Sequence, residues 1–424
     1  MFYRESDFQD TPAGEIPKDW EAKRVKDVAT DLVGGGTPST TCKDYWNGNI
    51  AWMTSAHING MIVTKGQKYI TRQGLENSAT NIVPKENLLV ATRVGIGKVA
   101  VNKIDIAISQ DLTGVIVDKN RADPNFLYWV LFNNSQKLKS LAQGSTIKGV
   151  LRDDLGKLRL PMPSKLSEQR GIVEVLGVVD SAIELADKVI AKTGRLKKGL
   201  MQQLLTRGIG HTEYKDTPIG KTPKEWNFTE LRDLISDVKT GFASGKRDEK
   251  GIVQVRMNNL TTDGRLLLDS YLKVPTPENI NGWLLKPNDF LFNNTNSIDL
   301  VGKSAIFKGA PFPCTFSNHF TRIKFKENLV LPEVILYHFI TQWEKGYFKS
   351  VAIRHVGQAA VHTEYLLRLQ IPLPPISEQK KIVEIISITN RKLELERHEK
   401  VKLEKIKLGL MDLLLTGKVR IKVD

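Results

Sequence analysis

The chain is poor in cysteine and has no long apolar run. Cys42 and Cys314 are the only cysteines among 424 residues, too few for a disulfide-stapled fold, and they form no CxxC or Cys/His cluster, so we expect two reduced packing residues. No stretch approaches the roughly 18 uncharged apolar residues that a membrane-spanning helix needs. The N-terminal segment is charged and has no apolar core. These features predict a cytoplasmic protein without a membrane partner.

The common motifs of catalysis are also missing. There is no GxxxxGKS/T phosphate loop, no HExxH and no GxSxG. Residues 34–36 (GGG) favour a turn, and residues 93–98 (RVGIGK) are more typical of a positively charged hairpin turn than of a nucleotide site. Asp123 and Pro124 begin a short likeness to an amino-methyltransferase loop that lacks its second proline, which favours a helix start. The histidines and carboxylates show no telling spacing, so no catalytic residue and no metal ligand is predicted.

Positive charge is in surplus. Sixty-two Lys and Arg against 47 Asp and Glu give a net charge of +15. Such a surplus favours a polyanionic partner, because Lys and Arg that neutralise phosphates release condensed counterions. A protein with a merely basic surface remains the alternative on charge alone.

An internal repeat organises the chain. Three blocks recur in the same order, with offsets of 206 and then about 210 residues: DTPAGEIPKDW (10–20) as DTPIGKTPKEW (216–226), LPMPSKLSEQRGIVEVL (160–176) as IPLPPISEQKKIVEII (371–386), and KKGLMQQLLT (197–206) as KLGLMDLLLT (407–416). Ordered repetition of this kind indicates two copies of one unit of about 210 residues.

Each copy begins with a strand-rich part and ends with a helical part. Short β-branched runs alternate with turn signals over 21–163 and 227–374, and one helix is expected in each, at 124–141 and 333–348. Both strand-rich parts close with a Pro-x-Pro segment, which predicts an extended exit. Ser167 and Ser377, each followed by Glu-Gln, are then expected to cap the next helix.

Apolar residues in the two helical parts follow heptad spacing, with a phase shift before Leu196, Leu200 and Leu204. Related stripes on corresponding segments predict an antiparallel coiled coil about a pseudo-two-fold axis, with two unrelated core helices as the alternative. The charged run ELERHEK (394–400) interrupts the second stripe and leaves its packing open. The predicted seam consists of Ile172, Leu176, Val179, Ile183, Ala186, Ile190, Leu200 and Leu204 with Ile382, Ile386, Leu393, Leu403, Ile406, Leu410 and Leu414.

Together these residues resemble one family, the specificity (S) subunits of type I restriction-modification systems. The likeness covers essentially the whole chain and comprises the entry segments ending PKDW and PKEW, the LPMP and IPLP exits into SEQ helices, and the helix ends LMQQLLTR and LMDLLLTG. The stretch GSTIKGVLRDDLGKLRLPMP (144–163) also resembles the end of a target recognition domain.

The resemblance implies an α+β fold with two homologous mixed α/β target recognition domains, each followed by a long helix, the two helices pairing as an antiparallel coiled coil. The expected limits are 1–163 for the first domain, 164–207 for the first spacer helix, 208–375 for the second domain and 376–424 for the second spacer helix with the C-terminal tail.

The resemblance further implies a DNA sequence-specificity subunit that is not catalytic by itself. Each domain would read one half of an asymmetric bipartite target in double-stranded DNA. The helices would fix the gap between the halves and dock two methyltransferase (M) subunits, which use S-adenosylmethionine, and restriction (R) subunits would add ATP-dependent cleavage. No cofactor is expected on this chain, since S-adenosylmethionine, ATP and Mg belong to the partner subunits.

The residues fit this implication, since scaffold segments match between the halves while the intervening loops differ. Residues 107–117 (AISQDLTGVIV) align with 315–325 (TFSNHFTRIKF), for example. Loop side chains able to contact bases or phosphates are Arg93, Lys98, Thr146 and Lys148 in the first half and Lys246, Arg247, Arg256, Asn293, Asn294, Lys303 and Arg354 in the second.

Three other functions remain open at this point. The chain could be a stand-alone bipartite DNA-binding protein without enzyme partners, and an apolar patch on the helices outside the seam would argue against this. It could be an enzyme that acts by itself, for which no motif speaks. RNA binding is disfavoured because the sequence has no aromatic stacking motif.

Overall fold

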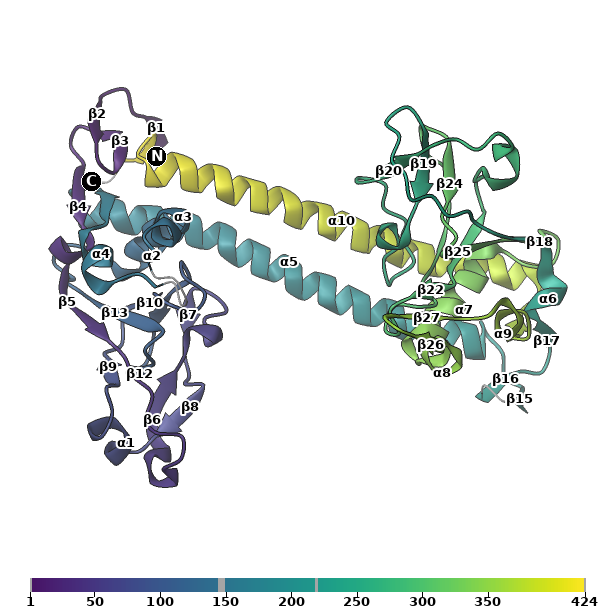
Figure 1. Cartoon of the computed structure of the whole chain (residues 1–424), viewed down its shortest axis with the longest axis horizontal. Coiled ribbons are helices and arrows are strands. Elements are labelled where there is room, and N and C mark those ends of the chain that lie inside the picture. Colours follow the sequence, from purple (N-terminus) through teal and green to yellow (C-terminus); the bar gives the residue numbers. More distant parts are fainter. Residues whose placement is uncertain (1, 144–148, 218–219, 423–424) are drawn as a thin grey trace. The chain divides into compact units, whose positions relative to one another are not determined.

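The chain builds two units, and each unit combines one strand-rich domain with half of both long helices (Figure 1). Unit 1 comprises Met1–Asp187 and His398–Asp424, and unit 2 comprises Lys188–Arg397. The structure is a computed structural model that describes residues 2–143, 149–217 and 220–422. Within these ranges no helix combines the length and apolarity that crossing a membrane requires.

The domain of unit 1 contains two larger sheets. In spatial order the first sheet is β5 (Ala29–Gly34), β13 (Leu112–Val117), β10 (Asn87–Ala91), β11 (Val99–Asn102) and β7 (Ile62–Val63). The second is β8 (Lys68–Ile70), β6 (Trp46–Met53), β12 (Ile106–Ile108) and β9 (Asn81–Val83). Central strands such as β10 are buried throughout, so after Asn87 the residues 88–91 of β10 (LLVA) are all apolar and do not alternate with polar ones.

Three small strand pairs complete unit 1. They are β2 (Phe8–Thr11) with β3 (Gly14–Pro17), β4 (Glu21–Arg24) with β14 (Arg159–Met162), and β1 (Phe2–Arg4) with β29 (Val419–Ile421). The β4–β14 pair contains the first Pro-x-Pro exit, which is extended as predicted. The β1–β29 pair joins the N-terminal segment to the C-terminal tail, and the two ends lie close together in Figure 1.

Unit 2 repeats the plan with its own strands. In spatial order its first sheet is β18 (Ile235–Thr240), β25 (Phe320–Phe325), β21 (Phe290–Asn293) and β23 (Ser304–Ile306). The second is β20 (Leu272–Val274), β19 (Ile252–Val255) and β24 (Cys314–Phe316). The third is β22 (Thr295–Asn296), β27 (Gln358–Ala360) and β26 (Ile353–His355). Its strand pairs are β15 (Tyr214–Thr217) with β16 (Gly220–Pro223) and β17 (Asn227–Glu230) with β28 (Gln370–Leu373). As β13 lies between β5 and β10, so β25 lies between β18 and β21, which confirms the duplication.

The short helices are shorter than predicted. The expected helix 124–141 is split at Asn134 into α2 (Pro124–Asn133) and α3 (Ser135–Ser140). The expected helix 333–348 ends earlier, because Gly346 takes a left-handed conformation (φ 78°) between α7 (Pro332–Glu344) and α8 (Tyr347–Val351). The remaining short helices are α1 (Arg72–Glu76), α4 (Arg152–Lys157), α6 (Leu231–Leu234), α9 (Thr363–Leu367), η1 (Val25–Asp27), η2 (Lys43–Tyr45), η3 (Ser55–His57), η4 (Met257–Asn259) and η5 (Ile280–Trp283).

Two long helices run through both units. They are α5 (Leu166–Arg207) and α10 (Ile376–Leu415), so Ser167 and Ser377 lie in the first turn and do not precede the helix as predicted. In unit 1, Lys407 and Lys400 of α10 pair with Asp180 and Asp187 of α5, at 2.5 and 2.7 Å. Residue numbers of the paired side chains rise along α5 while they fall along α10, so the two helices are antiparallel.

The observed seam differs from the predicted one near its centre. Leu196 is 57% exposed and Ile406 is 51% exposed, so the prediction that Ile406 belongs to the seam is wrong. The heptad instead continues without a phase shift, through the buried Thr193 and the half-buried Lys197 on α5 and through Lys407 on α10. The other predicted seam residues are buried or half-buried: Ile172, Leu176, Val179, Ile183, Ala186, Ile190, Leu200, Leu204, Ile382, Ile386, Leu393, Leu403, Leu410 and Leu414.

The Glu-Gln pairs at the helix starts have structural roles. Gln169 accepts a hydrogen bond from the amide of Asp123 and donates to the carbonyl of Pro163, so it ties the start of α2 to the extended exit. Gln379 makes the equivalent bonds with Leu331 and Pro374. Both glutamines are buried with their amides in use, which accounts for this residue type at both positions.

The neighbouring glutamates hold the segments that follow the long helices. Glu168 accepts two hydrogen bonds from Arg420 of the C-terminal tail, at 2.5 and 2.9 Å. Glu378 lies 2.9 Å from the imidazole of His211, in the linker after α5, and accepts a hydrogen bond from Trp226. The C-terminal tail therefore contacts Glu168 at the start of α5 as the linker after α5 contacts Glu378 at the start of α10.

Candidate nucleic-acid interface

The loops that follow β5 and β18 are held close to the adjacent strands in both domains. A Cβ atom at Gly35 would lie 2.2 Å from the carbonyl oxygen of Ile108, and one at Gly241 would lie 2.2 Å from that of Ser317. Only glycine tolerates so close an approach. The backbone therefore fixes two loops of different sequence, 35–42 and 241–251, on one common scaffold.

In the first domain, Arg93 and Lys98 lie at the two ends of the turn that joins β10 to β11. Gly95 and Gly97 make this turn with positive φ angles of 70° and 93°, as the hairpin interpretation predicts. Both cations are exposed, and neither side chain has an ion pair with any residue that the structure describes. Thr146 and Lys148 lie outside the described residues.

A second arginine, Arg152, which sequence reasoning missed, lines the same cavity as Arg93. The cavity measures about 690 Å³ and is lined by Arg93, Arg152, Gln110 and Gln143 among others. Arg152 begins α4 and comes within van der Waals distance of a Cβ placed at Gly34. Two guanidinium groups and two amides are suited to contact phosphate and base edges together. The only sequence signal was the place of Arg152 inside the 144–163 stretch.

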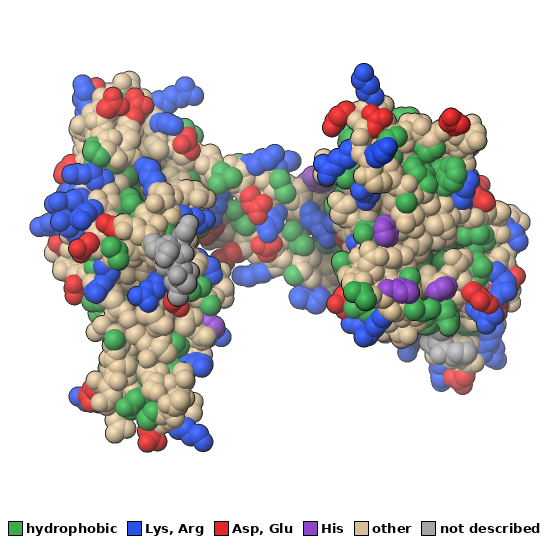
Figure 2. All heavy atoms as spheres, in the orientation of Figure 1, with side chains coloured by type: hydrophobic (Ala, Val, Ile, Leu, Met, Phe, Trp, Pro, Cys, Tyr) green, Lys and Arg blue, Asp and Glu red, His purple; other side chains and the backbone are tan. Residues whose placement is uncertain are grey.

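In the second domain, three predicted cations are free to meet a ligand. Lys246 and Arg247 are exposed on the loop 241–251, and Arg354 is exposed on β26. Arg256 is half-buried, and its guanidinium donates a hydrogen bond to the carbonyl of Ser244. Figure 2 shows Lys and Arg side chains interspersed with Asp and Glu, so the surplus of positive charge does not form one continuous patch on this face.

The structure corrects two predicted contact residues. Asn293 is fully buried, its amide donates to the carbonyls of Thr295 and His319, and its oxygen accepts from Asn296. Lys303 is 7% exposed and donates to two carbonyls, at 2.6 and 3.1 Å. Both side chains already use their hydrogen-bonding capacity inside the protein, so neither is placed to contact DNA. Asn294 is half-buried, and its amide bonds Thr321 and so supports the loop.

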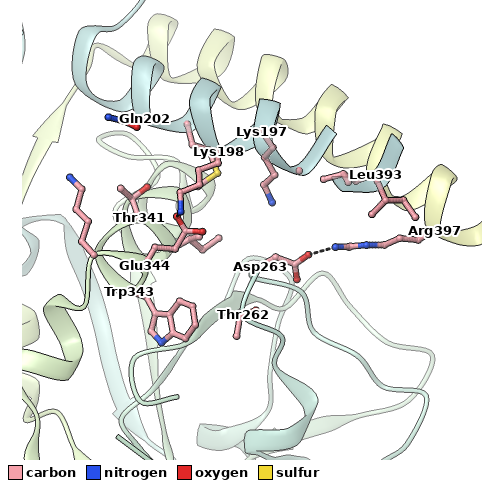
Figure 3. A pocket seen from close by; sticks show the side chains of 15 residues that line it. Lys197, Lys198, Gln202, Thr262, Asp263, Thr341, Trp343, Glu344, Leu393 and Arg397 are labelled. Carbon is pink, nitrogen blue, oxygen red and sulfur yellow. Dashed lines mark hydrogen bonds and ion pairs between the residues drawn. The ribbon is translucent and has the colours of Figure 1, made fainter. Parts of the chain in front are cut away.

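A different pocket lies in unit 2, where α5, α7 and α10 meet the loop around Asp263 (Figure 3). Burial opposes the charge of Asp263, but hydrogen bonds from Thr261, Arg265 and Arg397 outweigh burial and lower its pKa to about 2. Arg397 also pairs with Glu394, so part of the charged run 394–400 serves internal ion pairs. Burial lowers the pKa of Lys197, whose amine has no hydrogen bond with the residues described.

We expect Asp263→Asn to lower the free energy of unfolding by about 1–2 kcal/mol near neutral pH. The carboxylate has a lowered pKa in the folded state, so its contribution is complete above the ordinary value of 3.8 and is lost as the pH falls from about 4 to about 2. Urea unfolding of wild type and variant between pH 7 and 3 measures this. Asp269→Asn, at an exposed site in the same unit, is the control, and a difference that grows on acidification would contradict the prediction.

No group of three or more His, Cys, Asp or Glu that could hold a metal occurs in the part of the chain that the structure covers. Cys42 and Cys314 are both free thiols, and burial raises the pKa of Cys314 to about 11, as fits a packing residue.

Comparison with known proteins decides the family. The profile of the type I restriction modification DNA specificity domain matches twice, at 17–192 and 223–405, once on each repeat. The chain belongs to the type I restriction-modification specificity-subunit family. The type I restriction enzyme MjaVIII specificity subunit of Methanocaldococcus jannaschii is 26% identical over 100% of this chain and 98% of its own length. The EcoR124I/EcoR124II specificity subunit of Escherichia coli is 26% identical over 43% of this chain and 44% of its own length.

Solved structures of specificity subunits share this fold. The S subunit from M. genitalium aligns over 93% of this chain and 96% of its own, with a TM-score of 0.58 and 15% identity. A second solved structure, described as the structural basis of complex assembly and conformational transition of the type I R-M system, aligns over 95% of this chain and 99% of its own. Its TM-score is also 0.58, and its sequence is 14% identical. The predicted fold, two mixed α/β domains with two long paired helices, is thereby confirmed as the specificity-subunit fold.

Proposed function

We propose that this chain is the DNA sequence-specificity subunit of a type I restriction-modification complex and is not catalytic by itself. Its two target recognition domains read the two halves of an asymmetric bipartite target in double-stranded DNA. Supporting this, the domains share a scaffold but expose different side chains, Arg93, Lys98 and Arg152 in the first and Lys246, Arg247 and Arg354 in the second. The long helices set the unread gap between the two half-sites.

The helices also dock two methyltransferase subunits, one on each repeat. Val178 and Leu185 on α5 are 66% and 62% exposed, seven residues apart and so on one helix face. Their counterparts 210 residues later, Ile388 and Leu395 on α10, are both 64% exposed. Exposed apolar side chains at equal positions of both repeats are the single observation that carries this proposal, because two equal surfaces suit two copies of one partner.

The partner subunits supply the chemistry. Methyltransferase subunits bind S-adenosylmethionine and methylate adenine, and restriction subunits add ATP- and Mg-dependent cleavage, with the whole complex acting in the cytoplasm. The alternative is a stand-alone bipartite DNA-binding protein, which the exposed apolar positions on the helices disfavour.

Single-molecule sequencing of N6-methyladenine in host DNA, with this gene present and deleted, tests the proposal. We expect a split motif with a fixed unread gap whose methylation disappears on deletion. A split motif that keeps its methylation after deletion, or a genome without one, would overturn the assignment.

A variant of the outer helix face separates the two candidate functions. We expect Leu185→Ser combined with Leu395→Ser to abolish co-purification of the methyltransferase while DNA binding stays within about twofold, since both side chains lie outside the seam. Ser181→Ala combined with Ser387→Ala is the matched control at exposed polar positions of the same helices and should keep the complex intact. Retention of the methyltransferase by the serine variant would contradict docking on this helix face, and a wild-type chain that binds DNA but co-purifies with no methyltransferase would favour the stand-alone protein.

A further inference from the structure

Unpaired polar atoms gather in one small cavity of the second domain, below the loop 241–251. The cavity measures about 370 Å³. Four buried atoms that line it have no hydrogen-bond partner among the described residues: Gln254 Oε1, Arg256 Nε, Ser317 Oγ and His319 Nδ1. Gln254 is 1% exposed and Ser317 is 5% exposed. A buried polar group without a partner costs about 1–3 kcal/mol, so four around one cavity point to a polar ligand.

The same positions carry different chemistry in the first domain. Strand pairing matches Trp52 with Gln254, because Trp52 lies opposite Ala107 and Gln254 lies opposite the corresponding Thr315. Both side chains donate to the loop beside them, Trp52 to the carbonyl of Gly36 at 3.1 Å and Gln254 to that of Phe242 at 3.0 Å. Trp52 has no further polar atom, whereas Gln254 keeps a free acceptor.

The next two positions diverge in the same way. By the same register Arg256 corresponds to Thr54, whose hydroxyl bonds Gln67 inside the first domain. His319 corresponds to Asp111, so a carboxylate in one domain is replaced by an imidazole in the other. The residues that line this cavity thus differ in chemistry from their counterparts, on a scaffold that Gly35 and Gly241 hold in common, as two domains that read different half-sites require.

We propose that Gln254, Arg256 and His319 form the base-reading cluster of the second target recognition domain, an inference that rests on the proposed function. Arg256 supplies a donor through Nε, and Gln254 supplies an acceptor through Oε1. The two residues lie two positions apart at the end of β19. Together they match a base edge that offers an acceptor next to a donor, as adenine does through N7 and N6 in the major groove. The surrounding cations Lys246 and Arg247 hold the phosphates and carry no sequence preference.

The imidazole supports the same role. Burial, together with the positive charge of Arg256, lowers the pKa of His319, so the ring is neutral at pH 7. A neutral imidazole either donates or accepts through Nδ1, which lets this position adapt to the neighbouring base.

The test uses the full-length chain in complex with its methyltransferase and a duplex DNA library in which both half-sites are randomised. We expect Arg256→Gln to weaken the preference at one position of the second half-site by about 5- to 150-fold, as 1–3 kcal/mol implies, and to leave the first half-site unchanged. His319→Asn should weaken or change the preference at an adjacent position. If Arg256→Gln does not fold, the His319→Asn variant tests the base-reading cluster in its place. Lys246→Gln is the control and should lower affinity evenly without changing any preference.

The first half-site works as an internal reference. Folded variants that keep the wild-type preference at every position of the second half-site overturn the base-reading cluster, while the proposed function stands. A wild-type complex that selects no split sequence overturns the proposed function, and the cluster falls with it.

Discussion

Replacing Arg420 by alanine is expected to lower the free energy of unfolding by about 3–5 kcal/mol. The side chain is 6% exposed and bonds Glu168, Asp19 and Glu5. Glu168 is 4% exposed, so removal of the guanidinium leaves a buried carboxylate without its cation. Asp19 is 64% exposed and regains water, so most of the loss comes from Glu168.

Chemical unfolding followed by tryptophan fluorescence measures this loss, since Arg420 lies 5.5 Å from the ring of Trp20. Lys418→Ala is the control: its ion pair with Asp412 is exposed, so a change below about 1 kcal/mol is expected. Combining Arg420→Met with Glu168→Gln should recover much of the stability, because no buried charge then remains. A loss below about 1 kcal/mol for Arg420→Ala would show that the tail does not hold unit 1 together.

Two lysines at the same position of the two repeats are expected to respond in opposite ways to replacement by methionine. Lys407 pairs with Asp180 at 2.5 Å and lies 4.9 Å from the ring of Trp129, so Lys407→Met should lower stability by about 2–3 kcal/mol. Lys197 is the counterpart of Lys407, but Asn390 occupies the position that Asp180 has in the first repeat. Lys197 therefore lacks the equivalent carboxylate, and Lys197→Met should raise stability by about 1 kcal/mol.

The pH dependence gives a second reading of the Lys197 result. Burial lowers the pKa of this amine in the folded state, so the unfolded chain binds more protons and stability rises with pH up to the ordinary value of 10.5. The advantage of Lys197→Met should therefore shrink as the pH rises toward that value. Lys192→Met and Lys402→Met, an exposed pair at equivalent positions, serve as controls and should change stability by less than about 0.5 kcal/mol. Equal effects at 197 and 407 would contradict the argument.

The paired helices could be predicted from spacing, but the centre of their seam could not. Apolar residues at heptad spacing predicted the seam correctly at both ends of the helix pair. Near its centre, Leu196 and Ile406 fit an apolar stripe in the sequence but are exposed in the structure. Thr193 and Lys407 occupy the seam because their apolar parts pack there, which a count of apolar letters does not register.

The candidate interface shows the same limit. Exposed loop cations such as Arg93 and Lys246 follow from turn chemistry, which is local. Asn293 and Lys303 have equally suitable side chains, but strand register turns them inward. The convergence of Gln254 with His319 depends on the parallel pairing of β19 with β24, segments about 60 residues apart, and no local pattern reports it.

The division of the long helices between the units has a consequence for synthesis on the ribosome. Unit 2 is one continuous segment, Lys188–Arg397, and is fully translated before unit 1 receives its last piece, His398–Asp424. That piece supplies Met411 and Leu414 to the first core and brings Arg420 to Glu168. We therefore expect the second domain to mature first and the N-terminal one to wait until residues 398–424 have been synthesised. A product that ends before residue 398 would then expose the apolar start of α5 and become a substrate for proteolysis, so only chains that include residues 398–424 would persist.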